Sequence, residues 1–452
     1  MMNHQYKYIG FVGCYTKEGQ ADPFEASRGG VPHDRSKVGR GVLAIAMDAS
    51  GKLSYLNHGE PIISAEKLPN PSYLCILERV KGSIRSNRPP ALRDGGLCIV
   101  SELSEGKFQC FAVKVTPSQN GELEVHATAI GEALDTGGSW PCHIISTNVG
   151  DAMECIIVCN YGEAEGVLSL FGFHSDSLTD VYSKQSSISF GPGSKADRDR
   201  QEASHAHSAS VIPSISNCSS MDLCCADLGS DAIVQFSMTI DSATDDGRGL
   251  SFQCIEKDRL AALPGSGPRS LMFNPIFTDV AIVSLEMTAQ VWLIQRRVDD
   301  GKFIALGEPI SVLPENWPSD TELQYQFNHG RWASDAVWSP CGKFVYAAAR
   351  LHNSISVFEV QLSTTSSAEI SSTSTACDID GLNLIQRAST NGLTPRCLCM
   401  SECGQFVLVA HQHSHDVSSF QRNETDGKIS FIDRIEVPNA ACVKLIRPRM
   451  IG

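Results

Sequence analysis

The sequence predicts an all-β fold, a seven-bladed β-propeller made of four-stranded antiparallel blades. Three observations support this class. A short strand-opening motif recurs six times, the same succession of apolar strands and turns follows each copy, and the two ends of the chain supply the strands of one further blade. A long, nearly fixed period marks one supersecondary unit repeated along the chain, so the repeat decides the fold before any local pattern does.

The strand-opening motif returns every 62 to 70 residues. Its copies are Asn70-Pro71-Ser72, Trp140-Pro141-Cys142, His205-Ala206-His207, Gly267-Pro268-Arg269, Trp332-Ala333-Ser334 and Thr394-Pro395-Arg396. Counted between the middle residues, the steps are 70, 65, 62, 65 and 62. This spacing predicts that the six copies occupy the same place in six consecutive blades.

The unit that follows each opener is clearest at residues 333–358. Two apolar runs flank Ser339-Pro340-Cys341-Gly342, which is predicted to be a turn because proline presets φ and glycine accepts a positive φ. The copy at Pro395 aligns with it without gaps and has Ser401-Glu402-Cys403-Gly404 at the turn. Three such strands and a more variable fourth make one propeller blade.

The two ends of the chain are predicted to close the ring. Residues 8–15, 41–47 and 53–59 read as three strands that lack an opener, and residues 440–446 read as the missing innermost strand. Pairing them removes the exposed sheet edges of an open array. The count is seven blades in one domain that covers residues 1–452.

Four insertions interrupt the repeats and are predicted to be surface loops, at residues 17–38, 81–94, 191–201 and 363–376. The third carries Arg198 and Arg200 and lies immediately before the opener His205-Ala206-His207. We expect it to be a solvated loop. The alternative is that it covers a site formed by that opener.

The charge balance limits the class of partner. A net charge of −14 and a pI near 5.4 argue against nucleic-acid binding, which needs a basic surface. A small anionic substrate is compatible with this charge only if basic residues gather locally.

The sequence is predicted to be cytoplasmic. The first eight residues lack the pattern of a signal peptide, and no apolar run approaches the ~20 residues of a membrane span. The 17 cysteines lie mostly in apolar strand runs, which fits a reducing compartment, and their spacing is not that of a zinc site. No membrane partner is expected, and the oligomeric state is left open.

Placing the repeats in register produces two rings of residues. The first ring, at the start of the innermost strands, contains Ser72, Cys142, His207, Arg269, Ser334 and Arg396, followed in each copy by Tyr73, His143, Ser208, Ser270, Asp335 and Cys397. The second ring, at the end of the second strands, contains Glu102, Asn160, Tyr161, Asp227, Glu286, Arg350, His411 and Gln412. Because neighbouring strands are antiparallel, both rings are predicted to meet at one mouth of the central channel.

The composition of these rings indicates chemistry. Arginine suits carboxylate or phosphate, and a glutamate among arginines and histidines can activate water while a cation stabilises an oxyanion. This pattern favours hydrolysis of an activated acyl bond such as a lactone, with an anionic small-molecule substrate and without metal or cofactor. The predicted catalytic residues are Glu286, His207 and Arg269, and the predicted substrate-binding residues are His143, His205, Asn160, Arg350 and Arg396.

Several of these residues also have structural interpretations. Arg269 and Arg396 can form salt bridges between blades, and Asp227 is expected to order a tight turn. The histidines of the His205 opener can ligate a metal, as can His411, His413 and His415, for which a solvated loop is the favoured interpretation. Cys142 with His143 is discounted as a nucleophile pair, because neighbours on a strand point to opposite faces.

Segments spread over almost the whole chain resemble one known family, the seven-bladed propeller lactonases typified by bacterial 6-phosphogluconolactonase. They are residues 11–16, 70–74, 201–207, 226–231, 267–269, 285–287, 339–342 and 394–396. Fungal carboxymuconate cyclases look similar and share the scaffold. In two places the chain departs from the family pattern, which often has histidine at the position of Ser270 and asparagine at that of Ala349.

This resemblance implies a lactone hydrolase of carbohydrate metabolism that acts on a phosphorylated sugar lactone, as in the pentose phosphate pathway. The cleft residues it implies are His205, His207, Arg269, Glu286 and Arg350. In this interpretation Glu286 activates water, His207 and Arg269 stabilise the oxyanion, and Arg350 and Arg396 bind the phosphate or carboxylate. The alternatives are a muconate-type cycloisomerase and a non-catalytic propeller that binds a partner.

Overall fold

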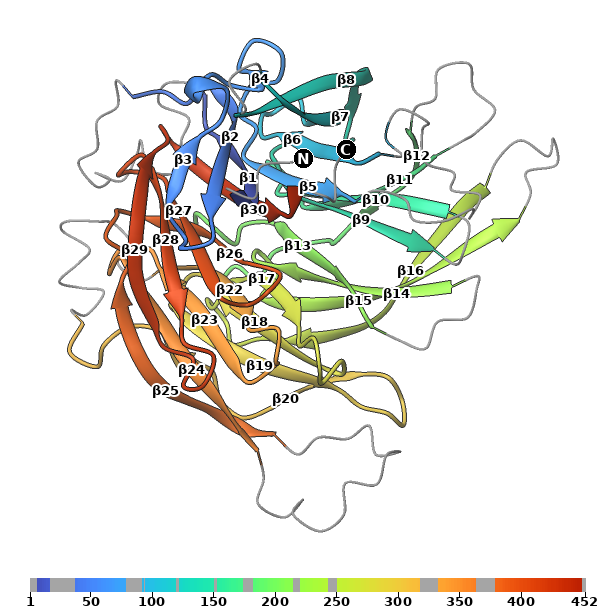
Figure 1. Ribbon diagram of the computed structural model, residues 1–452. Coiled ribbons are helices and arrows are strands. Elements are labelled where there is room, and N and C mark those ends of the chain that lie inside the picture. Colours follow the sequence, from blue (N-terminus) through green and yellow to red (C-terminus); the bar gives the residue numbers. More distant parts are fainter. Residues whose placement is uncertain are drawn as a thin grey trace.

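The computed structural model of the chain is a closed ring of seven antiparallel sheets (Figure 1), which confirms the predicted seven-bladed propeller. The structure describes residues 6–16, 37–78, 92, 94–118, 122–149, 153–173, 182–213, 220–242, 250–317, 332–362 and 379–448. The predicted insertions 17–38 and 81–94 lie largely outside the described residues, and 363–376 lies entirely outside them.

Each blade has an innermost and a second strand, paired antiparallel. The innermost strands are β5 (Tyr73–Leu77), β9 (Pro141–Val149), β13 (Ala206–Val211), β17 (Pro268–Phe273), β22 (Ala333–Trp338), β26 (Pro395–Met400) and β30 (Ala440–Ile446). The second strands are β6 (Gly96–Ser101), β10 (Met153–Asn160), β14 (Ser220–Asp227), β18 (Val280–Leu285), β23 (Phe344–Ala349), β27 (Phe406–His411) and β1 (Tyr6–Cys14). All six openers therefore begin an innermost strand, as predicted.

Two further strands complete each blade. The third strands are β7 (Lys107–Pro117), β11 (Val167–Phe173), β15 (Ala232–Ser242), β19 (Gln290–Arg296), β24 (Ser354–Leu362), β28 (Asp416–Arg422) and β2 (Gly41–Asp48). The outer strands are β8 (Leu123–Asp135), β12 (Tyr182–Ser189), β16 (Leu250–Ala261), β20 (Phe303–Ala305), β25 (Ile379–Ser389), β29 (Ile429–Glu436) and β3 (Leu53–Tyr55), with the short β4 (Ile63–Ser64) and β21 (Ile310–Ser311) beside β2 and β19.

The ring is closed between the two ends of the chain. Strand β1, blue in Figure 1, pairs antiparallel with the red β30, with Ile9 opposite Ile446 and Val12 opposite Val443. The predicted strand 53–59 is only partly correct. It ends at Tyr55, and Asn57–Gly59 form a 3₁₀ turn, η1, in which His58 has a φ of +54° and so leaves the extended conformation.

The apolar core lies between neighbouring blades. One buried cluster joins Ile233 of β15 to Leu285 of β18 and Trp292 of β19 in the next blade. Burial of each large apolar side chain contributes about 1.5–3 kcal/mol, so the blade faces hold the ring together. The free edges of the innermost strands line the central axis of the ring.

The predicted Ser-Pro-Cys-Gly turn is confirmed. Gly342 has a φ of +69°, and its amide donates to the Ser339 carbonyl oxygen at 2.9 Å. Gly404 repeats this geometry one blade later, with a φ of +72° and a bond of 2.7 Å to the Ser401 carbonyl. The described cysteines are all free thiols, and most are buried. In the described part of the chain, no helix has the length and hydrophobicity needed to cross a membrane.

Candidate active site

A β-bulge interrupts the start of the innermost strand in six of the seven blades. The residues skipped in the pairing with the second strand are Cys142, His207, Arg269, Ser334 with Asp335, Arg396 and Ala441. A bulge re-aims a side chain and ends regular pairing locally. Five of the six first-ring positions, all except Ser72, therefore lie at a repeated β-bulge, which takes these residues out of the regular hydrogen-bond ladder of the blade.

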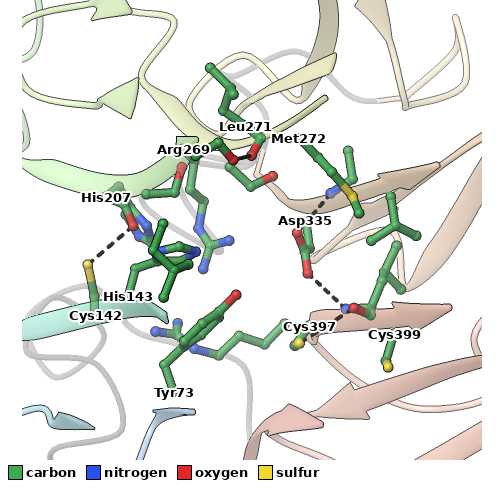
Figure 2. A pocket seen from close by; sticks show the side chains of 18 of the residues that line it. Tyr73, Cys142, His143, His207, Arg269, Leu271, Met272, Asp335, Cys397 and Cys399 are labelled. Atoms are coloured by element: carbon green, nitrogen blue, oxygen red, sulfur yellow. Dashed lines mark hydrogen bonds between the residues drawn. The ribbon is translucent and has the colours of Figure 1, made fainter. Parts of the chain in front are cut away.

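Two cavities lie along the axis. The mouth cavity, about 360 Å³, is lined by residues that include Glu102, Tyr161, Arg200, Glu286 and Arg350. The channel cavity, about 330 Å³ and drawn in Figure 2, is lined by residues of all seven innermost strands or their openers. Cys142, His207 and Arg396 line both cavities and mark the boundary between them.

Glu286, which follows β18, is the centre of a buried ion cluster on one side of the mouth. Its side chain is 2% exposed. Oε1 lies 2.7 Å from Arg200 Nη2 and 3.7 Å from Arg350 Nη1, and Oε2 lies 2.7 Å from Arg269 Nε. Burial alone raises the pKa of this carboxyl, but the charges of Arg200, Arg350 and Arg269 together hold the pKa well below its usual range.

This environment changes the role expected for Glu286. Both of its oxygens face guanidinium groups at ion-pair distance, and a carboxylate with a strongly lowered pKa is a weak base. The arrangement suits a counter-ion that fixes three arginines better than a group that takes a proton from water.

Arg200 corrects the prediction for the loop at residues 191–201. The first part of this loop is exposed, but its end turns inward and the Arg200 side chain is only 7% exposed. Arg200 reaches Glu286 and lies 3.3 Å from the Tyr161 hydroxyl through Nε. A turn closed by Asp197 Oδ1, which accepts the Arg200 amide at 2.9 Å, directs the chain inward. The segment covers part of the mouth, which is the alternative interpretation of the sequence.

Asp231 joins this loop to the opener that carries Arg269. Its Oδ1 accepts from Gln201 Nε2 at 2.7 Å and from the Gly267 amide at 2.8 Å. Its Oδ2 accepts from Ser194 Oγ and from the Gly265 amide, both at 2.7 Å. One buried carboxylate thus holds the neighbours of both arginines that contact Glu286 at 2.7 Å.

The opposite side of the mouth has a second, more open carboxylate. Glu102 follows β6, and its side chain is 14% exposed. Its Oε2 accepts from the Tyr15 hydroxyl at 3.0 Å and lies 3.8 Å from Arg396 Nη2. Arg396 also lies over the Tyr15 ring, 5.0 Å from its centroid. No hydrogen-bond donor of the described residues pairs with Glu102 Oε1.

The two histidines of the third opener have different surroundings. His205 is buried against Tyr161, with ring centroids 4.1 Å apart, and its Nδ1 lies 2.9 Å from the Tyr161 carbonyl oxygen. His207 is partly exposed and lines both cavities. Burial and the charge of Arg269 hold the pKa of His207 well below its usual range, so its imidazole is neutral at pH 7.

Two predicted substrate-binding residues lie away from the mouth. His143 lines the channel cavity and packs against the Tyr73 ring, with centroids 4.6 Å apart and the ring planes tilted by 36°. Asn160 lines neither cavity. It is fully buried inside its blade, where Nδ2 donates to the Val167 carbonyl at 3.1 Å, so its predicted contact with substrate is not supported by its position.

The turn predicted at Asp227 is confirmed, and the histidine-rich turn is corrected. Asp227 Oδ1 accepts from the His205 and Gly229 amides at 2.6 and 3.1 Å. His411, His413 and His415, expected in a solvated loop, are at most 3% exposed. Among the described residues, no group of three or more His, Cys, Asp or Glu is arranged to hold a metal ion.

Comparison with known sequences places this fold and site in a family. The sequence profile described as "Lactonase, 7-bladed beta-propeller" matches residues 98–445, well over half of the chain. The chain belongs to this lactonase family. Membership indicates a lactone hydrolase at the general level.

One named relative and one solved structure cover nearly the full length, and a second named relative covers three quarters of it. The 6-phosphogluconolactonase of Bacillus subtilis is 24% identical over 442 residues, which cover 97% of this chain and 99% of the relative. The 6-phosphogluconolactonase of Formosa agariphila is 26% identical over 338 residues, 75% of this chain and 80% of the relative. The periplasmic gluconolactonase of Pseudomonas aeruginosa shares the fold, with a TM-score of 0.65 at 21% identity over 97% of this chain and 99% of its own.

The two departures of this lactonase from the family pattern lie in different surroundings. Ser270 lines the channel cavity, and its hydroxyl lies 2.8 Å from that of Ser284. Ala349 is fully buried at the end of β23, within an apolar cluster. Neither position lines the mouth cavity, so the ion clusters of this lactonase do not depend on them.

Several mouth residues of the lactonase were not among the predicted site residues, and they include Arg200, Tyr15 and Glu102. Arg200 lies in an insertion with no counterpart in the other repeats, and Tyr15 lies at the end of a blade that has no opener. Glu102 held a place in the predicted second ring without an assigned role. Trp332 is not part of the mouth lining but lies beside it, 5.4 Å from Arg350 and 5.9 Å from Arg200. The usable signal was the aromatic first residue of the opener, shared by Trp332 and by Trp140, which lines the mouth.

Proposed function

We propose that this lactonase hydrolyses a phosphorylated sugar lactone such as 6-phosphoglucono-1,5-lactone. The observation that carries the proposal is the local charge at the mouth. Among the described residues, four arginines, at positions 200, 269, 350 and 396, gather around two carboxylates, Glu102 and Glu286, in a protein of net charge −14. Guanidinium groups gathered in this way suit a phosphate dianion.

The two sides of the mouth support different parts of the reaction. Among the described residues, Arg200, Arg269 and Arg350 surround a single buried carboxylate, and three guanidinium groups so close together favour phosphate on this side of the mouth. Glu163 and Glu202 at the rim oppose phosphate little, because water screens exposed charges. We assign phosphate binding to the Glu286 side.

The chemical step is assigned to the Glu102 side. Glu102 Oε1 takes a proton from a water molecule as the water oxygen bonds to the lactone carbonyl carbon. Arg396 and neutral His207, both at the boundary of the two cavities, stabilise the oxyanion. When the bond between that carbon and the ring oxygen breaks, the protonated Glu102 returns its proton to the ring oxygen, and the open-chain acid forms.

This assignment moves the general base from Glu286, where the sequence placed it, to Glu102. The reason is that both Glu286 oxygens face arginines, whereas one Glu102 oxygen accepts a hydrogen bond from no described donor. Tyr15, which donates to Oε2, fixes the orientation of the carboxylate. Arg200 takes a positioning and phosphate-binding role that the sequence did not assign.

The experiment compares two lactones with purified protein. Release of acid from 6-phosphoglucono-1,5-lactone and from glucono-1,5-lactone is followed by pH-stat, and the spontaneous rate is subtracted. We expect a kcat/KM at least tenfold higher for the phosphorylated lactone. Arg297→Met, which changes an exposed arginine whose partners are Asp299 and Asp300, serves as control and is expected to behave as wild type.

Two results contradict the proposal. A rate equal to the spontaneous rate for both lactones contradicts lactone hydrolysis. Consumption of a muconate, seen as loss of its absorbance, without lactone hydrolysis instead supports a cycloisomerase on the same scaffold.

A further inference from the structure

The channel cavity below the mouth holds a lysine that the proposed reaction does not use. Lys444 lies on β30, three residues after the bulged Ala441, and at ~3.3 Å per residue it is therefore about 10 Å deeper along the axis. Its Nζ donates to the Tyr73 hydroxyl at 3.1 Å and lies 4.7 Å from the centroid of the Tyr73 ring. The side chain is partly buried and lines the cavity.

Lys444 has no direct ion-pair partner within the described part of the protein. Asp335 is the one carboxylate among the residues that line the cavity, and both of its oxygens accept backbone amides, those of Ala336 and Leu398, at 3.0 Å. A charge that is partly removed from water and has no counter-ion favours an anion.

Two further donors lie near this lysine. The Tyr73 hydroxyl contacts Lys444 directly, and the Tyr73 ring packs against His143 (Figure 2). Burial, together with the charges of Lys444 and Arg269, lowers the pKa of His143 to about 3, so its ring is neutral. The His143 Nδ1 accepts the Ala209 amide at 3.5 Å, which leaves the proton on Nε2 as a hydrogen-bond donor.

The remaining wall at this depth is mostly apolar. It is formed by the side chains of Ile145, Met272, Val337, Leu398, Cys399 and Met400, together with Ser210, whose hydroxyl donates to the Leu271 carbonyl at 2.8 Å. Sugar hydroxyls find few partners on such a wall, whereas a short hydrocarbon chain fits it. A single ammonium also matches one negative charge better than two.

From this geometry we propose that the channel cavity binds the carboxylate of a small aliphatic acid through Lys444, Tyr73 and His143, with the hydrocarbon part against the apolar wall. The site is separate from Arg200 and Arg350 at the mouth, whereas Arg269 and Arg396 line the end of the channel cavity nearest the mouth. The proposal does not rest on lactone hydrolysis, because binding is measured without turnover.

The test is a titration of the full-length protein with butyrate, read by NMR of methyl-labelled methionine. Met272 and Met400 line the cavity, and Met272→Leu and Met400→Leu assign their signals. We expect saturable shifts of both signals with butyrate, and none with butanol, which has the same chain length without the charge. Lys444→Leu is expected to weaken butyrate binding about tenfold or more, because it removes a charged hydrogen bond.

Two other variants keep the test decisive. Lys7→Leu is the matched control, because Lys7 also contacts an aromatic ring, Phe406, but lies outside the cavity, and it is expected to bind as wild type. Tyr73→Phe removes only the hydroxyl and is expected to weaken butyrate binding about threefold. This variant provides the test if Lys444→Leu does not fold. Equal butyrate affinity in wild type, Lys444→Leu and Tyr73→Phe overturns the proposal, as do equal shifts with butanol. Loss of binding in Arg350→Leu but not in Lys444→Leu also overturns it, since the anion then occupies the mouth.

Discussion

Glu102 and Glu286 occupy the same position in their blades, directly after the second strand, but their surroundings differ. Glu286 is 2% exposed and has three arginines within 4.0 Å, whereas Glu102 is 14% exposed and has one arginine at 3.8 Å and a tyrosine hydroxyl at 3.0 Å. The repeat places both carboxylates at the mouth. The neighbours supplied by other blades and by one insertion surround Glu286 with arginines and leave one oxygen of Glu102 without a described donor, which is the basis of the roles proposed for them.

The largest expected effect comes from Glu102→Gln. Loss of the proposed general base is expected to lower kcat by about 100- to 10,000-fold, which is the usual contribution of proton transfer by a positioned side chain. KM and the unfolding transition are expected to change little, because Glu102 is partly exposed. The check is steady-state kinetics with urea unfolding of the same sample. An unchanged kcat removes the distinction drawn between the two glutamates.

The same change at Glu286 is expected to act on stability first. Glu286→Gln leaves the buried arginines without their counter-ion, and breaking a buried ion pair costs about 3–5 kcal/mol. Urea unfolding measures the loss in free energy of unfolding. Glu60→Gln is the control, because Glu60 forms an exposed pair with Arg40, and its stability is expected to stay within about 1 kcal/mol of wild type. A folded Glu286→Gln protein of wild-type stability contradicts the counter-ion role.

The stability contributed by Glu286 is expected to depend on pH in one direction. Because the pKa of this carboxyl is lowered in the folded protein, the unfolded chain binds more protons as the pH falls below the usual glutamate value of about 4.5. The stability difference between wild type and Glu286→Gln is therefore full above pH 5 and shrinks as the pH falls further. Urea unfolding at several pH values from 6 to 3 checks the sign.

A smaller effect is expected from Asp231→Asn. An amide in place of this carboxylate retains one acceptor oxygen and loses bonds to two of the donors, which costs about 1–3 kcal/mol of stability. Because Asp231 anchors Gln201 beside Arg200, we also expect a higher KM for the phosphorylated lactone with kcat retained. A purely structural role predicts the stability loss without a change of KM.

The smallest expected effect concerns pH near neutrality. Burial and Arg269 keep the pKa of His207 well below its usual value, so the imidazole stays neutral from pH 6 to 8. The kcat/KM corrected for spontaneous hydrolysis is therefore expected to show no step from this histidine in that range. A step near pH 6.5 that disappears in His207→Gln contradicts the assigned neutral state.

The sequence predicted those features of the fold and the site that follow from the repeat. Because the openers recur at a nearly fixed period, the register alone identified Arg269, Glu286 and Arg350 as neighbours at the mouth, which their ion pairs confirm. The register could not predict the position of Arg200, because this residue lies in an insertion whose path depends on hydrogen bonds to Asp197 and Asp231 rather than on the repeat.

Burial between blades was the other property that the register did not reveal. Asn160 holds the expected ring position but turns into its own blade to satisfy the Val167 carbonyl. His411 was read as part of an exposed turn, yet it is buried with Nδ1 2.7 Å from Asp416 Oδ1. In both cases the side chain is fixed by a partner that the repeat does not encode.

The division of the mouth into a chemical side and an anion-binding side is tested most directly by the ratio of kcat/KM for the phosphorylated and unphosphorylated lactones. We predict that Glu102→Gln lowers both values alike and keeps the ratio. Arg350→Met is predicted to lower the ratio about tenfold, the effect of one charged hydrogen bond, while the unphosphorylated lactone reacts as with wild type. A ratio that changes in Glu102→Gln and stays constant in Arg350→Met contradicts the account.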